Sequence, residues 1–560
     1  MKNVWFMIPA RAGSKAIPKK NIRLLAGKPL VSYVLESVSS VTDREHIVVS
    51  TDDAEIKELA APHALVHNRS KSSADDQSTL DEVALEVAKF LKKEHGADED
   101  DILVTVQPTS PFIRPDTIRK AVEKQRKGGS DTVLTVKDDR HLRWTMNGHK
   151  PEPLYEKRVN RQQMKPVFSE TGGIILTTIE FLIENGTRIG EEVSLLEVDE
   201  KEGLDIDTYA DWALAEYWMN KLQILIRVDG RKKIGYGHLY RALAIAQNIH
   251  SHEVIFVTRS DNDYRLGKNF LEGHHFPIIE IQSNKDFLKE LDVLDPDIVI
   301  NDILDTEKSY IEDLKSRDIF VVNLEDLGEG SHIADLVIND LYPGIFPQEN
   351  HWYGVEYAIL NPNFERVEPR SEPGAEVNNV LLAFGGTDPS NLTVKALNAL
   401  LHIGYEGNVT VVIGPGHSRK EQVTKLAQKL NEEAEVLQDV KNMATVMRKN
   451  DLALTSAGRT VTELMTMGVP TIAISQNMRE MRHDHASSSY GVVNLGLGRS
   501  ITSEALGDHI KMFISDQQLR VDMYNRMRKA VSNRSNSAVV SKIVSAYKNS
   551  NKSLKTNGYS

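Results

Sequence analysis

The sequence predicts an α/β protein built from mostly parallel sheets with helices on both faces. Short apolar runs of strand length alternate with stretches of helical periodicity, and glycine-rich loops follow several of these runs. In the first half the strand-like runs lie at 47–50, 102–107, 132–136 and 193–198. A chain of 560 residues is too long for one core, so several lobes are expected at about 150 residues each.

Composition and charge exclude several classes of protein. The apolar share of 40% and the charged share of 26% are those of a soluble globular protein. A net charge of −12 argues against nucleic acid as a partner. The absence of cysteine excludes disulfides, thiolate zinc sites and a cysteine nucleophile. Because no apolar run of 18 residues and no signal peptide is visible, we expect a cytoplasmic protein without a membrane partner.

The segment 8–21, IPARAGSKAIPKKN, has the composition of a phosphate-binding loop between a strand and a helix. Backbone N–H groups of such a loop point at an anion, and its cations offset the phosphate charge. A solvated basic loop after an edge strand is an equally good interpretation, and the GxxxxGK[ST] pattern is absent. The polar side chains available for phosphate are Arg11, Ser14, Lys15 and Asn21.

Two later segments place polar side chains beyond strands. In VQPTSPFIRPD (104–114) the prolines end the strand and present Gln107 to the crevice, unless the segment is only a turn with a helix cap. In GLDIDTYAD, Asp205 and Asp207 alternate along an extended chain, so both carboxylates point to one side, as one hard cation requires. The alternative for Asp207 is a helix N-cap.

These segments resemble the motifs of the CMP-N-acylneuraminate cytidylyltransferases, which activate sialic and related nonulosonic acids with CTP. The first segment is close to the family pattern IPARxGSKxIPxKN, with Ala16 in place of the usual glycine, and DIDT matches the family's metal motif. The resemblance implies a Rossmann-like nucleotidyltransferase domain that forms a homodimer and holds Mg²⁺ at Asp205 and Asp207. Arg11 and Lys15 are implied to stabilise charge on the phosphates and on the leaving pyrophosphate.

The same resemblance implies further substrate contacts. The segment RSKSSADDQSTLDEV matches the family's RPxxLAxD segment, although Ser70 replaces the usual proline, and FSETGGIIL resembles the stretch that folds over the acceptor sugar. An arginine can pair bidentately with the sugar carboxylate, but a buried strand with a basic flank explains Arg161 equally well. The implied contacts are Arg69, Asp76, Gln107, Arg161 and Glu170.

The second half carries a histidine and glycine loops at strand-to-helix junctions. In GYGHLYR, His238 follows Gly237 at a helix N-terminus, where the dipole favours the neutral imidazole that a general base must be. A lone histidine is nevertheless more often structural. The loops FGGTDPSN and SAGRTVTE suit nucleotide binding, with a diphosphate at the second helix N-terminus and Glu463 within reach of ribose hydroxyls, or else are plain turns. Their candidate residues are Gly385, Gly386, Ser456, Gly458 and Glu463.

This half resembles the UDP-sugar hydrolases of pseudaminic acid synthesis and related spore-coat polysaccharide proteins, through RVDGxxxIGYGHxxR, FGGTDPSN and SAGxxxxE. The resemblance implies a two-lobed fold like that of GT-B glycosyltransferases, with UDP in the cleft, His238 as the base that activates water, and no cofactor. Gln476 and Asn477 are kept from the family, whereas the rest of SQNMREMRHDHA is more charged than expected. The expected domains are 1–221, 222–374 and 375–548, followed by a disordered tail at 549–560.

Together the two resemblances predict a bifunctional enzyme. It would activate pseudaminic acid, or legionaminic or another sialic-like acid, and would hydrolyse a UDP-2,4-diacetamido-trideoxyhexose. A separate PEP-dependent nonulosonate synthase would act between these steps as a functional partner. For the second half, a glycosyltransferase and a non-catalytic nucleotide-sugar sensor stay open as alternatives. A hinge is expected near 371–379, SEPGAEVNN, between the two lobes.

Overall fold

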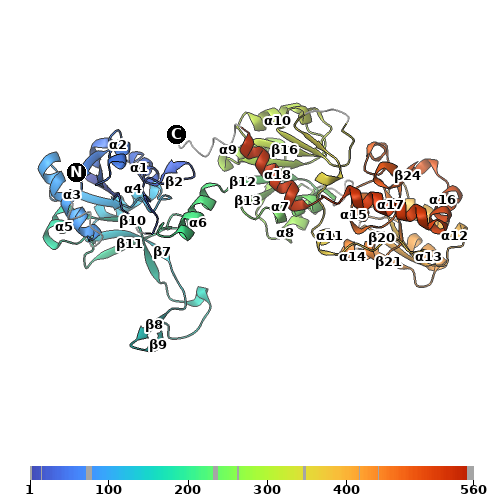
Figure 1. Cartoon of the computed structure of the whole chain (residues 1–560), viewed down its shortest axis with the longest axis horizontal. Coiled ribbons are helices and arrows are strands. Elements are labelled where there is room, and N and C mark those ends of the chain that lie inside the picture. Colours follow the sequence, from blue (N-terminus) through green and yellow to red (C-terminus); the bar gives the residue numbers. More distant parts are fainter. Residues whose placement is uncertain are drawn as a thin grey trace. The chain divides into compact units, whose positions relative to one another are not determined.

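The computed structural model describes residues 3–13, 16–70, 78–230, 237–261, 264–344, 349–414, 416–438 and 440–550. It divides into two compact units, Met1–Asn220 and Lys221–Ser560 (Figure 1). All three large sheets are mostly or wholly parallel and carry helices between consecutive strands, which confirms the predicted α/β class. Within the described ranges, every helix is too short or too polar to cross a bilayer.

The first unit is built on a seven-stranded sheet in which only β10, the third strand in the order, runs antiparallel to its neighbours. Its two faces are both buried, because Phe6 and Ile8 of β1 enter one core and Trp5 and Met7 enter the other. In sheet order the strands are β11 (Val193–Glu197), β7 (Thr132–Asp138), β10 (Phe168–Thr178), β6 (Ile102–Val106), β1 (Val4–Pro9), β4 (Ile47–Thr51) and β5 (Leu65–Asn68).

Helices cover both faces of this sheet, and side-chain caps fix where several of them begin. Thr79 and Glu82 form a capping box at the start of α3. The helices are α1 (Leu30–Ser39), α2 (Ala54–Ala60), α3 (Leu80–His95), α4 (Pro115–Arg126), α5 (Ile179–Asn185) and α6 (Tyr209–Met219). Two small hairpins complete the unit: β2 (Leu24–Leu25) pairs with β3 (Lys28–Pro29), and β8 (Trp144–Asn147) pairs with β9 (Lys150–Pro153). The hairpin of β8 and β9 lies at the end of a projecting arm (Figure 1).

The second unit contains two lobes, and the first lobe is a seven-stranded parallel sheet. In order its strands are β14 (Ile278–Ile281), β13 (Glu253–Arg259), β12 (Gln223–Val228), β15 (Ile298–Asp302), β16 (Phe320–Leu324), β17 (Leu336–Asn339) and β18 (His351–Tyr353). Its helices are α7 (Gly237–Asn248), α8 (Arg265–Glu272), α9 (Asn284–Leu294) and α10 (Lys308–Lys315). The carboxyl ends of β12, β15, β16 and β17 therefore lie side by side at one edge.

The second lobe is a six-stranded parallel sheet with its own core. In order its strands are β21 (Glu435–Gln438), β20 (Asn408–Ile413), β19 (Asn379–Ala383), β22 (Leu452–Ser456), β23 (Thr471–Ser475) and β24 (Val493–Leu497). Its helices are α12 (Leu392–His402), α13 (Lys420–Leu430), α14 (Met443–Arg448), α15 (Thr460–Met467), α16 (Ser503–Ser515) and α17 (Gln517–Ala530), and the short α11 (Asn363–Arg366) precedes it.

The last helix, α18 (Asn536–Asn549), packs on the first lobe although 375–548 was expected to form the second. Its Val539, Val540 and Ile543 enter the core of the first lobe, and the Tyr547 hydroxyl donates to Asp297 at 3.0 Å. The chain therefore crosses between the lobes twice.

The segment that joins the lobes is bound along α17. Arg520, which is fully buried, donates from Nη2 to the carbonyls of Gly374 and Ala375 at 2.7 and 2.8 Å. Gln517 donates to the carbonyl of Pro373 at 3.2 Å. Because these carbonyls are held, the expected hinge near 371–379 has fewer free torsions than its linker composition suggested.

Candidate active sites

In the first unit, the loop after β1 is held beside the end of β4. The backbone N–H of Ala12 donates to Asp52 Oδ1 at 2.8 Å, and Asn21 donates from Nδ2 to the carbonyl of Arg11 at 2.9 Å. Arg69 approaches from the end of β5 and donates to the carbonyl of Ser50 at 3.3 Å. Burial lowers the pKa of Arg69, and Arg11 lowers it further, while Asp52 opposes this shift. Arg11, Asn21 and Arg69 thus gather at one sheet edge, whereas the predicted Ser14, Lys15 and Asp76 lie outside the described residues.

Gln107, which follows β6, and Asp205, which lies before α6, come together at Gly172 of β10. A Cβ added to Gly172 would lie 2.7 Å from Gln107 Nε2 and 3.5 Å from Asp205 Oδ2. Gly172 has φ +67°, which glycine adopts without strain. Gln107 and Asp205, which were predicted from different segments, therefore both lie beside Gly172.

The two aspartates of DIDT differ in environment. Asp205 Oδ1 is buried without a hydrogen-bond partner among the residues placed in the structure. Burial raises the pKa of Asp205 and outweighs the Thr109 hydroxyl, which lowers it, and the nearby Asp207 charge raises it as well. Asp207 has a 72% exposed side chain and pairs with Lys20 at 3.2 Å. Thr208, not Asp207, is the N-cap of α6, so the alternative interpretation of Asp207 is wrong.

Arg161 and Glu170 lie toward the arm. Arg161, in a short 3₁₀ turn, has a 61% exposed side chain and lies 3.9 Å from Asp138 at the end of β7. Asp138 is already bound by Arg140, whose hydrogen bonds lower its pKa to about 2. Glu170 is an exposed residue of β10 opposite Val136. β10 is mostly buried from Thr171 onward and Arg161 lies exposed on the chain before it, so the buried strand with a basic flank stays open as an alternative for Arg161.

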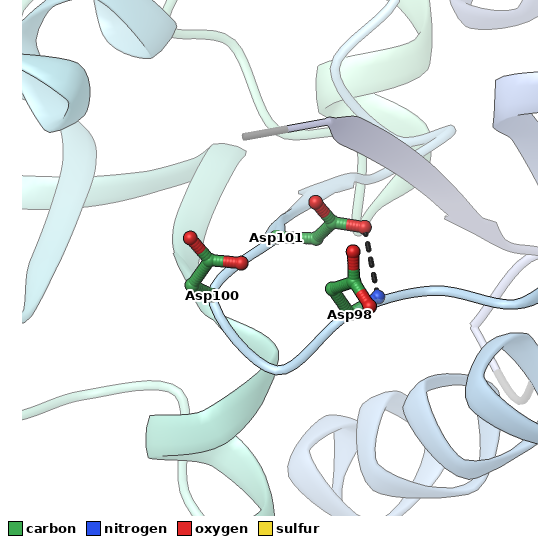
Figure 2. A group of neighbouring side chains, drawn as sticks. All are labelled: Asp98, Asp100 and Asp101. Atoms are coloured by element: carbon green, nitrogen blue, oxygen red, sulfur yellow. Dashed lines mark hydrogen bonds between the residues drawn. The ribbon is translucent and has the colours of Figure 1, made fainter. Parts of the chain in front are cut away.

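A different acidic cluster, Asp98, Asp100 and Asp101, has the spacing of metal ligands (Figure 2). It precedes β6 and therefore lies at the amino end of that strand, away from the loops described above. Asp101 accepts hydrogen bonds from the backbone of Asn3, from Trp5 Nε1 and from the backbone of Asp98. These bonds tie β1 to β6, so Asp101 has a structural role.

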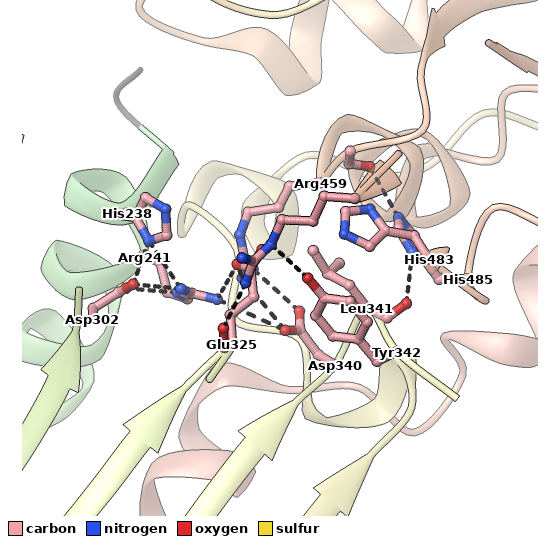
Figure 3. A network of polar contacts seen from close by, with 12 residues as sticks. His238, Arg241, Asp302, Glu325, Asp340, Leu341, Tyr342, Arg459, His483 and His485 are labelled. Carbon is pink, nitrogen blue, oxygen red and sulfur yellow. Dashed lines mark hydrogen bonds and ion pairs between the residues drawn. The ribbon is translucent and has the colours of Figure 1, made fainter. Parts of the chain in front are cut away.

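In the second unit, His238 lies in the first turn of α7 and faces the end of β15 (Figure 3). Its Nδ1 bonds Asp302 Oδ1, and Arg241 donates from Nε to Asp302 Oδ2 at 2.7 Å. Burial alone would raise the pKa of Asp302, but the Arg241 charge overcomes this and holds it at about 2. An ionised carboxylate only accepts, so Nδ1 carries a proton, and in the neutral ring the lone pair is then on Nε2.

A network of charges extends from Arg241 across the two lobes (Figure 3). Arg241 donates to Glu325 Oε2 at 3.2 Å, and Arg459 of the second lobe donates to the same oxygen at 2.7 Å. Arg459 also donates to Asp340 Oδ2 at 3.1 Å. Burial raises the pKa of Asp340 to about 7, against the lowering effect of Arg241. A Cβ on Gly237 would lie 3.9 Å from Arg459 Cδ, which places the start of α7 beside the start of α15.

The two glycine loops of the second lobe meet at Ser456. A Cβ on Gly385 or Gly458 would lie 4.0 or 3.6 Å from Ser456 Oγ, and Gly386 packs against Gly414, where a Cβ would approach within 2.4 Å. Gly385 has φ +85°, which glycine adopts without strain, and the close backbone approach in its loop is the one between Gly386 and Gly414.

The loop at Gly458 presents two backbone N–H groups at the start of α15. His483 donates from Nδ1 to the carbonyl of Ala457 at 2.7 Å, and His485 donates from Nε2 to the carbonyl of Gly458 at 2.9 Å. In a trans peptide the N–H points opposite to the C=O, so the N–H groups of Gly458 and Arg459 point away from the histidines. Neither N–H finds an acceptor in the described part of the chain. Such a pair at a helix N-terminus suits an anion.

The remaining candidate residues of this lobe differ in whether their side chains are already engaged in hydrogen bonds. Glu463 lies in the first turn of α15, and burial raises its pKa to about 7. Gln476 donates to Asp388 Oδ1 at 2.9 Å and accepts from the backbone of Ser390 at 3.1 Å. Asn477 accepts from the backbone of Arg479 at 2.9 Å. The side chains of Gln476 and Asn477 thus brace loops, which is a structural role the sequence analysis did not predict.

Sequence reasoning missed Asp302, Glu325, Asp340 and Arg459. A signal existed, because VIND occurs twice, at 299–302 and 337–340, each time where a strand of the first lobe ends. Each copy delivers its aspartate to the network around His238.

Two family models match the chain. A cytidylyltransferase model matches residues 5–158, and a model of the glycosyltransferase family 28 C-terminal domain matches residues 380–538.

Curated relatives match different shares of the chain. This chain is 34% identical to CMP-N,N'-diacetyllegionaminic acid synthase of Legionella pneumophila over 222 residues, which cover 38% of this chain and 94% of that protein. It is 26% identical to the spore coat polysaccharide biosynthesis protein SpsG of Bacillus subtilis over 325 residues, 55% of this chain and 94% of the relative. An uncharacterised protein of Methanocaldococcus jannaschii is 32% identical over 284 residues, 47% of this chain, which spans only 58% of that relative.

Proposed function

The first unit of this chain belongs to the cytidylyltransferase family that includes CMP-N,N'-diacetyllegionaminic acid synthase, and on this premise we propose that it transfers CMP from CTP to a nonulosonic acid with release of pyrophosphate. The observation that carries the proposal is the meeting of Gln107, Gly172 and Asp205 beside the loop after β1. This arrangement supports a nucleotide bound across the carboxyl edge of the sheet.

The residues of DIDT fit a divalent cation. Asp205 offers a buried carboxylate oxygen that has no partner within the placed residues, and Asp207 offers an exposed carboxylate on the same short segment. Hard cations such as Mg²⁺ take oxygen ligands of this kind and share them with phosphates and water. Mg²⁺ held by Asp205 and Asp207 would supply charge neutralisation on the triphosphate.

The protein's own groups would orient the reactants. Arg11 and Arg69, which lie near each other after β1 and β5, would bind phosphate oxygens, and the Gln107 amide would bind the base or sugar of CTP. The acceptor's anomeric hydroxyl would attack the α-phosphorus and lose its proton to solvent, and the bond to the leaving pyrophosphate would break.

A direct assay would identify the nonulosonic acid that is the substrate. Purified full-length protein would be incubated with CTP, Mg²⁺ and either pseudaminic acid or N,N'-diacetyllegionaminic acid, and the CMP-sugar detected by mass spectrometry. The second unit's resemblance favours pseudaminic acid, whereas the Legionella relative acts on the legionaminic compound. Absence of pyrophosphate release with both acids would refute the proposal.

For the second unit we infer a hydrolase that converts a UDP-sugar into UDP and free sugar. The observation that carries it is the bond between His238 Nδ1 and Asp302, which leaves Nε2 as the proton acceptor. Nε2 would take a proton from water, the water oxygen would attack the sugar C1, and the bond from C1 to the diphosphate would break. The N–H groups of Gly458 and Arg459 would receive the charge of the leaving diphosphate.

A glycosyltransferase is the second candidate for this unit, favoured by the match of residues 380–538 to glycosyltransferase family 28. In that case Nε2 would deprotonate an acceptor hydroxyl instead of water. Release of free sugar from UDP-2,4-diacetamido-2,4,6-trideoxy-β-L-altropyranose without an acceptor supports hydrolysis. Turnover only with added sugar acceptors would favour transfer, and UDP binding without any turnover would favour a sensor.

A further inference from the structure

A short segment of the second lobe, residues 479–485, is held by the first lobe. At its start, Arg479 donates to the two carboxylate oxygens of Asp305 at 3.0 and 3.1 Å and to the Tyr342 hydroxyl at 2.8 Å. Asp305 follows β15 and Tyr342 follows β17, so both partners lie at strand ends of the first lobe. The position of this segment is therefore set by the first lobe as well as by the second.

The other end of the segment is held in the same way (Figure 3). The backbone N–H of Asp484 donates to the carbonyl of Leu341 at 2.8 Å, again just after β17. The ring of Tyr342 meets His483 edge-on, with 4.9 Å between the ring centres. His485 is 1% exposed, so it cannot move without a shift of the residues around it.

The same segment fixes the loop assigned to the diphosphate. His483 donates from Nδ1 to the carbonyl of Ala457 at 2.7 Å, and His485 donates from Nε2 to the carbonyl of Gly458 at 2.9 Å. Because a peptide unit is planar, a bond that fixes its C=O also fixes the N–H on the opposite side. The two histidines therefore set the directions of the N–H groups of Gly458 and Arg459.

We propose that His483 and His485 are positioning residues for the diphosphate, and that their placement depends on the pairing of Arg479 with Asp305 of the first lobe. Donors that are already aligned bind an anion without the cost of ordering them. A first-lobe residue thereby controls the affinity of a loop that belongs to the second lobe. This role rests on the proposed nucleotide-sugar function, because the loop is the one assigned to the leaving diphosphate.

An exchange of amide side chains at the two histidines tests the donors. The amide nitrogen of Asn can take the place of Nδ1, and that of Gln lies near the place of Nε2. His483→Asn and His485→Gln therefore keep the donor to the loop, whereas His483→Gln and His485→Asn lose it. At each position the amide that keeps the donor is the matched control for the amide that loses it.

The measured quantity is the ratio of the affinities for UDP and for uridine on the full chain, by calorimetry for UDP and by saturation-transfer NMR titration for uridine. Uridine lacks the diphosphate, so general damage to the nucleotide site lowers both affinities. We expect the ratio to fall about five-fold or more in His483→Gln and His485→Asn, and to stay within about two-fold of the wild type in His483→Asn and His485→Gln. An equal fall with both amides at a position would overturn the positioning role.

The dependence on the first lobe is tested by Asp305→Ala, which removes both bonds to Arg479. Asp292→Ala is the matched control, because Asp292 of α9 also pairs with an arginine, Arg317, at 2.7 Å. We expect the ratio of UDP to uridine affinity to fall about three-fold in Asp305→Ala and to stay unchanged in Asp292→Ala.

The outcomes separate this inference from the proposed function. Equal ratios in Asp305→Ala and Asp292→Ala would overturn the dependence on the first lobe. If the wild type binds UDP and every variant keeps its ratio, the positioning role fails while the nucleotide site stands. If the wild type binds neither UDP nor uridine, the proposed nucleotide-sugar function is refuted and the positioning role with it.

Discussion

Arg459 of the second lobe donates to Glu325 of the first lobe at 2.7 Å, on the same carboxylate oxygen that Arg241 contacts at 3.2 Å. One oxygen thus links the arginine that holds Asp302 to the arginine at the start of α15. The base and the glycine loop, which lie in different lobes, are joined through this atom.

Replacing Arg459 by Met should destabilise the second unit. The change leaves Glu325 and Asp340 buried with only Arg241 to neutralise them, and an unpaired buried charge costs about 3 kcal/mol. Differential scanning calorimetry should show a lower unfolding midpoint for the variant. The exposed Arg499→Met is the control and should leave the midpoint unchanged.

Asp302→Asn should reduce turnover of a UDP-sugar by about 10²–10⁴-fold, because the amide no longer fixes the proton on Nδ1 of His238. UDP affinity should stay unchanged, since Asp302 is not in the glycine loops. The pH profile of activity separates a positioning role of Asp302 from general damage. In the variant, the rise of activity with pH that reports deprotonation of the base should be lost. A parallel fall of activity at every pH would contradict the assignment.

Gly172→Ala should raise KM for CTP about ten-fold, because the added Cβ would lie 2.7 Å from Gln107 Nε2 and displace the amide. Gly186→Ala is the matched control, since its φ of +66° is nearly the same but nothing lies within 4 Å of its Cβ. Both variants should lose about 1 kcal/mol of stability from the left-handed backbone. Only Gly172→Ala should change the kinetics. An equal KM for CTP in both variants would contradict the assignment of Gln107 to the CTP site.

Asp205→Asn and Asp207→Asn should each lower pyrophosphate release roughly 100-fold at saturating CTP and Mg²⁺. Asp205→Asn should unfold at the same or a higher temperature than the wild type, because burial raises the pKa of the native carboxyl. Asp100→Asn, in the acidic cluster at the opposite strand end (Figure 2), should change neither property. Full activity of Asp207→Asn would remove the metal assignment.

Glu463 should make stability depend on pH. Its pKa of about 7 in the folded state exceeds the ordinary value of 4.5, so the folded state binds the proton more tightly. Stability is therefore fullest below about 4.5 and falls as the pH rises through about 7, by on the order of 1–3 kcal/mol. Glu463→Gln lacks this loss, so its melting temperature should match the wild type at pH 4.5 and exceed it at pH 8. A pH-independent difference would contradict the prediction.

The parts of the fold and sites that could be predicted are those written in contiguous motifs. Strand-to-helix junctions with glycine, and the paired aspartates of DIDT, are local patterns, so His238, Gly458 and Asp205 could be named from the sequence. Asp302, Glu325 and Asp340 could not, because they reach His238 through the order of strands β12, β15, β16 and β17, a long-range property. Periodicity likewise could not place α18, because the spacing of its apolar residues does not say which lobe they pack against, and they pack against the first.

The path of α18 sets an order on folding. During synthesis, 375–530 supplies a complete parallel sheet with its helices before α18 exists, whereas the lobe that bears His238 lacks a core helix until then. The lobe made earlier therefore exposes apolar surface, around Leu222 and Phe320, while the later one closes. We expect a released chain truncated after residue 530 to expose the His238 lobe to proteases and chaperones while it protects the nucleotide loops.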